Sequence, residues 1–130
     1  MSVPLCKLWA ACDVSTGKRD ANHDQEDGKY QFFTCAANQR RANTFAFDGK
    51  SIILAGNGAN VGLVLFYDGK FEAYQRTYVL NNFKKSVDAR YVYHHLCAYW
   101  KQVNENAQFG SATNYIRMQN FEDYIFPLPS

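Results

Sequence analysis

The stretch from Ser51 to Leu80 constrains the fold of this chain more than any other. Its sequence is SIILAGNGANVGLVLFYDGKFEAYQRTYVL, in which an apolar run meets a glycine-rich segment, Gly56 to Gly62. A second apolar run, LVLFY, follows, and Asp68-Gly69 separates it from FEAYQRTYVL. Short apolar and aromatic runs bounded by turn-forming residues are typical of β-strands. This part of the chain is therefore predicted to form a sheet.

The tripeptide Asp-Gly-Lys marks three predicted turns. It occurs at residues 27–29, 48–50 and 68–70, each time before a strand-like run. Asp-Gly suits tight turns because glycine readily adopts a positive φ. The flanking sequences differ, so we predict separate turns in a meandering sheet rather than a repeat protein. A polar loop is expected at 15–27, and β-strands are expected at 8–14, 29–35, 43–47, 51–55, 61–67, 70–75, 77–81 and 124–128.

One helix is predicted at about residues 88–104. Ser86 or Asp88 can cap its first amide groups. An apolar stripe recurs at the helical period and would pack on the sheet; it consists of Val92, Leu96, Tyr99 and Val103. The expected fold class is therefore α+β, with a twisted, mostly antiparallel sheet and one main helix.

The composition is that of an ordinary globular domain. The chain has 130 residues, which suits a single domain over 1–130. Aromatic residues make up 16% of it, which favours a β-rich structure. No apolar run approaches the length of a membrane-spanning helix, and the first residues lack the regions of a signal peptide. We therefore expect a cytoplasmic protein with no membrane partner.

Charge is unevenly distributed along the chain. The net charge of only +2 argues against a tight, nonspecific DNA binder. Residues 36–90 nevertheless carry eight basic and four acidic side chains. Clustered cations are the expected footprint of phosphate contact, although lysines at strand ends also serve solubility. The cations of this segment are Arg40, Arg41, Lys50, Lys70, Arg76, Lys84, Lys85 and Arg90.

The cysteines and histidines do not predict a metal or catalytic site. The four cysteines lack CxxC spacing, so we expect reduced, largely buried thiols: Cys6, Cys12, Cys35 and Cys97. His94 and His95 are adjacent, and neighbouring helical side chains point in different directions, so they chelate poorly. Neither a nucleophile elbow nor HExxH occurs. A cysteine-dependent enzyme stays open as an alternative, and it would need a thiol of low pKa beside a histidine.

Four segments in a fixed order resemble a known family. They are CDVSTGKRDANHDQEDGKYQFFTCA, the stretch from Ser51 to Leu80, VDARYVYHHLCAYW and FGSATNYIRMQNFEDYIFPLPS. Together they cover nearly the whole chain, and in this order they resemble the target recognition domain of the specificity subunit of type I restriction-modification systems. The resemblance implies recognition of one half of a split target in double-stranded DNA.

The resemblance also implies that this chain does no chemistry. In such systems methyltransferase (M) subunits bind S-adenosylmethionine, and a restriction (R) subunit performs cleavage and ATP-driven translocation. The expected partners are thus double-stranded DNA and the M and R subunits, while S-adenosylmethionine, ATP and Mg²⁺ belong to those subunits. The spacer helix and second recognition domain are expected to be absent, so we predict weak DNA affinity for the chain alone, micromolar or worse.

The glycine-rich segment allows two interpretations. Its third glycine is one place late for GxGxxG, no GK[ST] occurs, and a strand-like run follows, so nucleotide binding is disfavoured. The glycines either permit a sharp turn, or let the backbone approach DNA while Asn57 and Asn60 face a groove.

Two further groups of residues have the chemistry of DNA contact. Gln75 and Arg76 lie between tyrosines, and in an extended strand Gln75 and Thr77 would share one face. Arginine pairs with guanine and glutamine with adenine, although the arginine can equally stack on its own sheet. Asn38-Gln39-Arg40-Arg41 combines amides for base edges with cations for phosphates, or is a solvated loop.

The remaining candidates lie in polar loops. Lys18 and Arg19 share a loop with acidic residues that would repel phosphate unless they point away, and Arg117 follows a polar cluster of Ser111, Thr113 and Asn114. The predicted DNA-binding residues are Lys18, Arg19, Thr34, Asn38, Gln39, Arg40, Arg41, Asn57, Asn60, Gln75, Arg76 and Arg117. A different class of function also stays open, that of an aromatic-rich β module that binds a protein or a carbohydrate.

Overall fold

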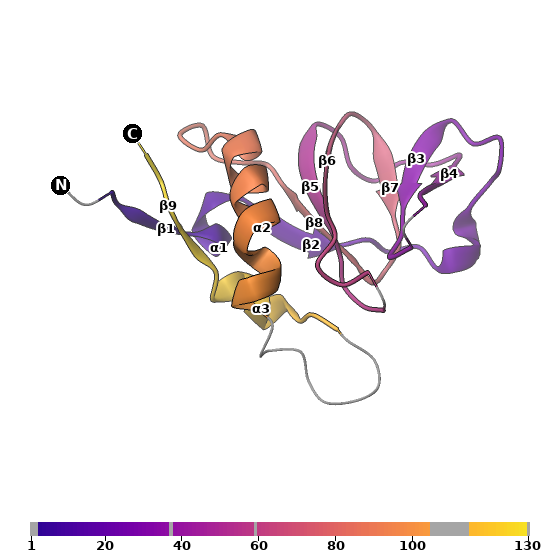
Figure 1. The fold of residues 1–130 in the computed structure, drawn as a ribbon. Coiled ribbons are helices and arrows are strands. Elements are labelled where there is room, and N and C mark those ends of the chain that lie inside the picture. Colours follow the sequence, from indigo (N-terminus) through magenta and orange to yellow (C-terminus); the bar gives the residue numbers. More distant parts are fainter. Residues whose placement is uncertain (1–2, 37, 59, 105–114, 130) are drawn as a thin grey trace.

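The computed structural model describes residues 3–36, 38–58, 60–104 and 115–129 (Figure 1). Its elements in chain order are β1 (Leu5–Lys7), α1 (Leu8–Ala11), β2 (Asp13–Thr16), the 3₁₀ turn η1 (Ala21–His23), β3 (Tyr30–Phe33), β4 (Arg40–Ala42), β5 (Lys50–Ala55), β6 (Val64–Asp68), β7 (Phe71–Ala73), β8 (Thr77–Asn81), α2 (Ala89–Val103), α3 (Met118–Glu122) and β9 (Ile125–Pro127). The predicted α+β class with one main helix is confirmed.

The strands within the described ranges form three sheets rather than one. The largest has the order β2-β8-β5-β6 and is antiparallel throughout. A second has the order β4-β3-β7, in which β3 and β7 run parallel. The third pairs β1 with β9. Figure 1 shows α2 lying over the four-stranded sheet, with the β4-β3-β7 sheet on the far side from β1 and β9.

Strand β5 lies at the centre of the molecule and is buried on both faces. Ile52 and Leu54 belong to the core between the four-stranded sheet and α2. Ile53 points to the other face and packs with Phe33 and Phe71 against the three-stranded sheet. Successive strand residues point to opposite faces. An uninterrupted apolar run such as SIILA is therefore what a strand between two cores requires.

Helix α2 begins where the sequence predicted and uses a slightly different apolar face. The Asp88 carboxylate accepts a hydrogen bond from the Arg90 amide at 2.9 Å, so Asp88 is the cap. The predicted stripe is wrong at two positions, because Tyr99 is 49% and Val103 60% exposed. Three- and four-residue spacings both fit a helix, and the larger Trp100 ring takes the buried place.

Two predicted strands have the wrong position. The range 8–14 begins with helix α1, and only its last residues belong to β2. The range 43–47 is not a strand; β4 comes earlier and pairs with β3, while Phe47 makes an isolated bridge to Phe71. The reason is that Ala42 is fully buried, which pins the register at β4.

The thiols are free, but the expectation that they are largely buried is wrong. Only Cys12 is buried, and burial raises its pKa to about 12. Cys6 and Cys35 are half-buried. Cys97 is exposed because it follows Leu96, which takes the inward position on α2. Among the described residues, no cysteine sulfur lies within hydrogen-bonding distance of a histidine ring.

His95 on α2 should make stability depend on pH. Its Nδ1 lies 2.8 Å from the Tyr124 hydroxyl, and burial lowers the pKa of the imidazole below the ordinary 6.5. The unfolded chain then binds the proton more readily than the folded one. Stability should therefore fall as the pH drops through about 6.5.

The measurement is the melting temperature at about pH 7.5 and about pH 5.5. The decrease in melting temperature from the higher to the lower pH should be smaller for His95→Gln than for the wild type. His94→Gln changes an exposed neighbour on the same helix and should leave the drop unchanged. An identical drop in His95→Gln and wild type would show that His95 does not contribute.

Candidate nucleic-acid interface

The turn between β7 and β8 presents Gln75 and Arg76 to solvent. The Thr77 amide donates to the Tyr74 carbonyl at 2.9 Å, which closes the turn. The predicted extended strand through these residues is wrong, and Thr77 is fully buried at the start of β8. The physical reason is that β7 and β8 belong to different sheets, so the chain must turn to pass between them.

Three other segments bond to this turn. The Gln75 amide donates to the Arg19 carbonyl at 2.9 Å. The Arg76 carbonyl accepts from the Gly56 amide at 3.0 Å and from the Cys35 thiol at 3.2 Å. The structure therefore brings together the loop that carries Lys18 and Arg19, the loop after β3, the glycine-rich segment and the β7–β8 turn.

A hollow of about 520 Å³ opens beside the turn, lined by Gly56, Asn57, Gln75, Arg76, Tyr78 and Tyr115. Glycine is required at its edge, because a Cβ on Gly56 would lie 2.2 Å from the Arg76 carbonyl oxygen. The Tyr78 hydroxyl donates to the Ile116 carbonyl at 3.0 Å, which holds this lining residue in place, and burial raises the pKa of Tyr78. Aromatic, amide and cationic groups thus meet in one concave surface.

Arg117 lies next to this hollow. Its guanidinium sits 5.6 Å from the centre of the Tyr115 ring, and Nη2 donates to the Tyr115 hydroxyl at 3.3 Å. Its own amide donates to the Asn120 side chain at 2.8 Å at the start of α3. The other members of the predicted polar cluster, Ser111, Thr113 and Asn114, lie outside the described residues.

The loop after β3 is held by its own polar side chains. Gln39 accepts from the Thr34 amide at 2.8 Å and donates to the Ala36 carbonyl at 2.9 Å. Thr34 is buried and accepts from the Ala36 amide, whereas Asn38 is exposed. Through these hydrogen bonds Thr34 and Gln39 stabilise the conformation of the loop. Their contact with DNA stays a prediction.

Of the other predicted amides and cations, Asn60 lies beside the β7–β8 turn, whereas Arg40 and Arg41 lie on β4. Asn60 donates to the Cys35 carbonyl at 3.0 Å, next to the turn. Arg40 pairs with Asp24 at 2.9 Å, and Arg41 donates to the carbonyl oxygens of Gly28 and Lys29. Both arginines are exposed on β4, outside the lining of the hollow.

The positive excess of the middle segment does not form one patch. Lys50, Lys84 and Lys85 line a separate hollow of about 490 Å³. Figure 1 shows the β8–α2 loop, which carries Lys84 and Lys85, at the top of the view and the β5–β6 loop at the bottom. Lys70 and Arg90 lie over aromatic rings of Phe45 and Phe66. The candidate interface therefore depends on a subset of the cations.

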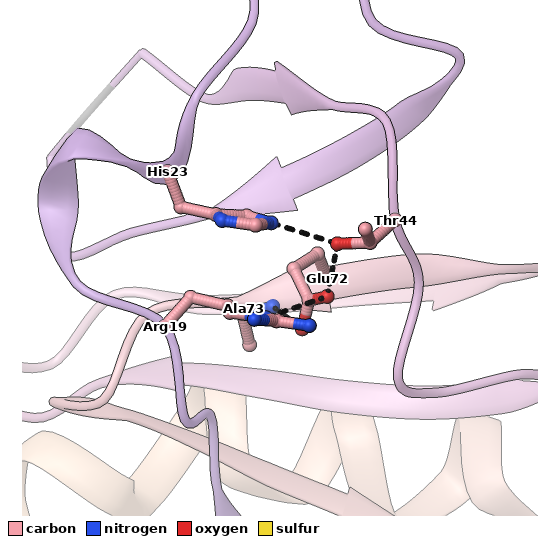
Figure 2. A network of polar contacts seen from close by, with 5 residues as sticks. All are labelled: Arg19, His23, Thr44, Glu72 and Ala73. Atoms are coloured by element: carbon pink, nitrogen blue, oxygen red, sulfur yellow. Dashed lines mark hydrogen bonds and ion pairs between the residues drawn. The ribbon is translucent and has the colours of Figure 1, made fainter.

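Sequence reasoning missed a polar network behind Arg19. The Glu72 carboxylate lies 3.4 Å from Arg19 Nε and accepts from the Thr44 hydroxyl at 2.7 Å. His23 Nε2 lies 2.7 Å from the same hydroxyl, and the Ala73 amide donates to Glu72 at 3.3 Å. Figure 2 shows these side chains arranged from His23 through Thr44 to Glu72 and Arg19. A lone carboxylate within the strand-like FEAYQ was the available signal.

The described ranges contain neither a cluster of metal ligands nor a membrane-spanning helix. There, no three His, Cys, Asp or Glu side chains lie together where they could hold a metal ion. The helices in the same ranges are too short or too polar to span a membrane.

Comparison with known proteins assigns a family. Residues 10–130 match the model of the type I restriction modification DNA specificity domain. The chain is 42% identical over 124 residues to the type I restriction enzyme EcoDI specificity subunit of Escherichia coli, covering 95% of this chain and 27% of that protein.

Solved structures share the fold. The type I restriction-modification S subunit from M. genitalium superposes with a TM-score of 0.77 at 20% identity, over 97% of this chain and 34% of that one. A chain from a structure of complex assembly and conformational transition of the type I R-M system gives a TM-score of 0.70 at 17% identity, with 97% and 34% covered. The chain spans about a third or less of these relatives. It belongs to the type I restriction-modification DNA specificity domain family.

Proposed function

We propose that this chain recognises one half-site of a split target in double-stranded DNA and is itself non-catalytic. The observation that carries the proposal is the convergence of three other segments on the β7–β8 turn. Together with the turn, these segments bring Arg19, Arg76 and the amides of Asn57 and Gln75 into one region of the molecule. Cations position a duplex through its phosphates, and arginine and amide side chains discriminate base edges.

The family supports a division of labour with other subunits. We infer that methylation and cleavage belong to M and R subunits, together with S-adenosylmethionine, ATP and Mg²⁺. This chain would then supply sequence recognition alone. With few cations around the hollow, it should bind DNA weakly by itself, near the nonspecific range of micromolar or worse.

The direct test is the salt dependence of binding to a labelled duplex of random sequence, measured by fluorescence anisotropy. Contact with about three phosphates predicts that the logarithm of the affinity falls with the logarithm of the salt concentration with a slope of about −3. Salt-independent binding, or no binding at the lowest salt, would contradict the proposal. Retention on a carbohydrate or protein matrix would instead favour the aromatic-rich β module.

A further inference from the structure

A buried carboxylate, Glu72, lies directly behind the cationic loop of the candidate interface. The Glu72 side chain is 1% exposed, whereas that of its partner Arg19 is 46% exposed. Burial of a carboxylate costs free energy unless the group is paired and hydrogen-bonded. The pairing is provided here by residues from two surface segments, which suggests that Glu72 organises them.

Arg19 is held through its inner nitrogen. Nε lies 3.4 Å from Glu72 Oε2, and among the described residues neither terminal nitrogen of Arg19 has a hydrogen-bond partner. The main chain is held as well, because the Arg19 amide donates to the Ala73 carbonyl and its carbonyl accepts from Gln75. Since a guanidinium has five N–H donors, the terminal nitrogens stay available for an outside partner.

The same carboxylate holds a second segment. Thr44 uses its single hydroxyl proton to donate to Glu72 Oε2, so His23 Nε2 must be the donor in its 2.7 Å contact with that hydroxyl. His23 ends the short η1 turn of the Arg19 loop, and Thr44 follows β4, which carries Arg40 (Figure 2). One buried group therefore fixes the Arg19 loop relative to β4.

We propose that Glu72 is a positioning residue for base recognition, which acts by holding the Arg19 guanidinium so that its terminal nitrogens meet a base edge. The inference rests on the proposed DNA-recognition function. A two-point hydrogen bond to a base edge needs a fixed donor, whereas attraction to phosphate does not. Glu72 thus raises discrimination between sequences, while its negative charge weakens attraction to any duplex.

Glu72→Gln separates the effect on sequence discrimination from the effect on overall attraction to DNA, because the two are expected to change in opposite directions. The amide keeps the shape and an oxygen for Thr44, but it loses the charge that holds Arg19. The affinity ratio between a selected and a scrambled duplex should fall about tenfold. Affinity for the scrambled duplex should stay equal or become tighter, because the variant has one negative charge fewer.

The matched control is Glu122→Gln, on the exposed face of α3. It makes the same change in net charge away from the network, so it should leave the affinity ratio unchanged. Arg19→Lys supplies an independent variant that leaves the buried carboxylate and the net charge intact. It replaces the guanidinium, with its Nε–H and both terminal nitrogens, by a single ammonium group, so it should lower the ratio as Glu72→Gln does, with wild-type affinity for the scrambled duplex.

Combining the two changes tests whether Glu72 acts through Arg19. In the Arg19→Lys background, Glu72→Gln should lower the ratio no further, because coupled residues are not additive.

If either folded single variant keeps the affinity ratio within about twofold of the wild-type value, the inference is overturned. Parallel loss of both affinities with a lower melting temperature would also overturn it, since that is a structural role alone. If Glu72→Gln does not fold, an Arg19→Lys chain that keeps the wild-type ratio still overturns the inference.

The behaviour of the wild-type chain distinguishes failure of the proposed function from failure of the role of Glu72. A folded wild-type chain that prefers no duplex sequence would overturn half-site recognition, and this inference with it. A wild-type chain that selects a site, with variants that select it equally well, would overturn the role of Glu72 alone.

Discussion

Replacement of Trp100 by alanine should lower the free energy of unfolding by about 3–5 kcal/mol. The Trp100 side chain is 1% exposed, and its ring stacks on Phe121 at 4.6 Å and lies 5.4 Å from the Tyr124 ring. It thereby joins α2 to the C-terminal part of the core. Truncation leaves a large cavity that the surrounding rings cannot fill. Denaturant unfolding followed by circular dichroism measures the change.

Two further variants make this prediction specific. Trp9→Ala removes the same side chain where it is 44% exposed and should cost less than about 1 kcal/mol. Trp100→Phe should cost less than alanine, since it fills much of the space and Nε1 of Trp100 has no hydrogen-bond partner within the described ranges. An equal loss for Trp9→Ala and Trp100→Ala would contradict the central place of Trp100 in the core.

Replacement of Arg76 by alanine should weaken binding to a selected duplex about 5- to 150-fold. The side chain is exposed at the turn and borders the hollow. The bonds from Gly56 and Cys35 go to its carbonyl oxygen, so truncation of the side chain leaves them in place. The expected loss therefore reflects lost contact with DNA, and an unchanged melting temperature checks this.

The control is Lys85→Ala, which removes a cation from the hollow at the opposite end of the sheets and should change affinity less than about twofold. Arg76→Lys then distinguishes the kind of contact. If the arginine holds a phosphate, lysine should restore most of the affinity for every sequence. If it pairs with a base, lysine should relax the preference at one position. An equal loss from Lys85→Ala would contradict the location of the interface.

Local signals predicted most elements because they are set by neighbouring residues. The run SIILA predicted β5, and Asp88 with the apolar period predicted α2. Positions that depend on distant contacts were not predictable in the same way. Leu8–Ala11 form a helix rather than a strand, and Ala42 pins β4 through its register against β3. Local pattern does not specify which sheet a strand joins.

The candidate site was predictable as residue types but not as an arrangement. Amides and cations in loops indicated which side chains could contact DNA. Their gathering depends on bonds between segments far apart in the sequence, such as those from Arg19 and Gly56 to the β7–β8 turn. Glu72 was missed for the same reason, since its partners come from two other segments. The structure also separates Lys84 and Lys85 from the interface, although charge along the chain groups them with Arg76.

The decisive experiment for recognition of a DNA half-site is selection of the folded chain against a randomised pool of duplex DNA at low salt. We expect enrichment of one motif of a few base pairs, with affinity that falls as salt rises. Two copies of the chain joined by a flexible linker should enrich the same motif twice per duplex, because linking raises the effective concentration. Failure of both the single and the linked chain to enrich any motif, with their native melting transitions intact, would contradict recognition of a DNA half-site.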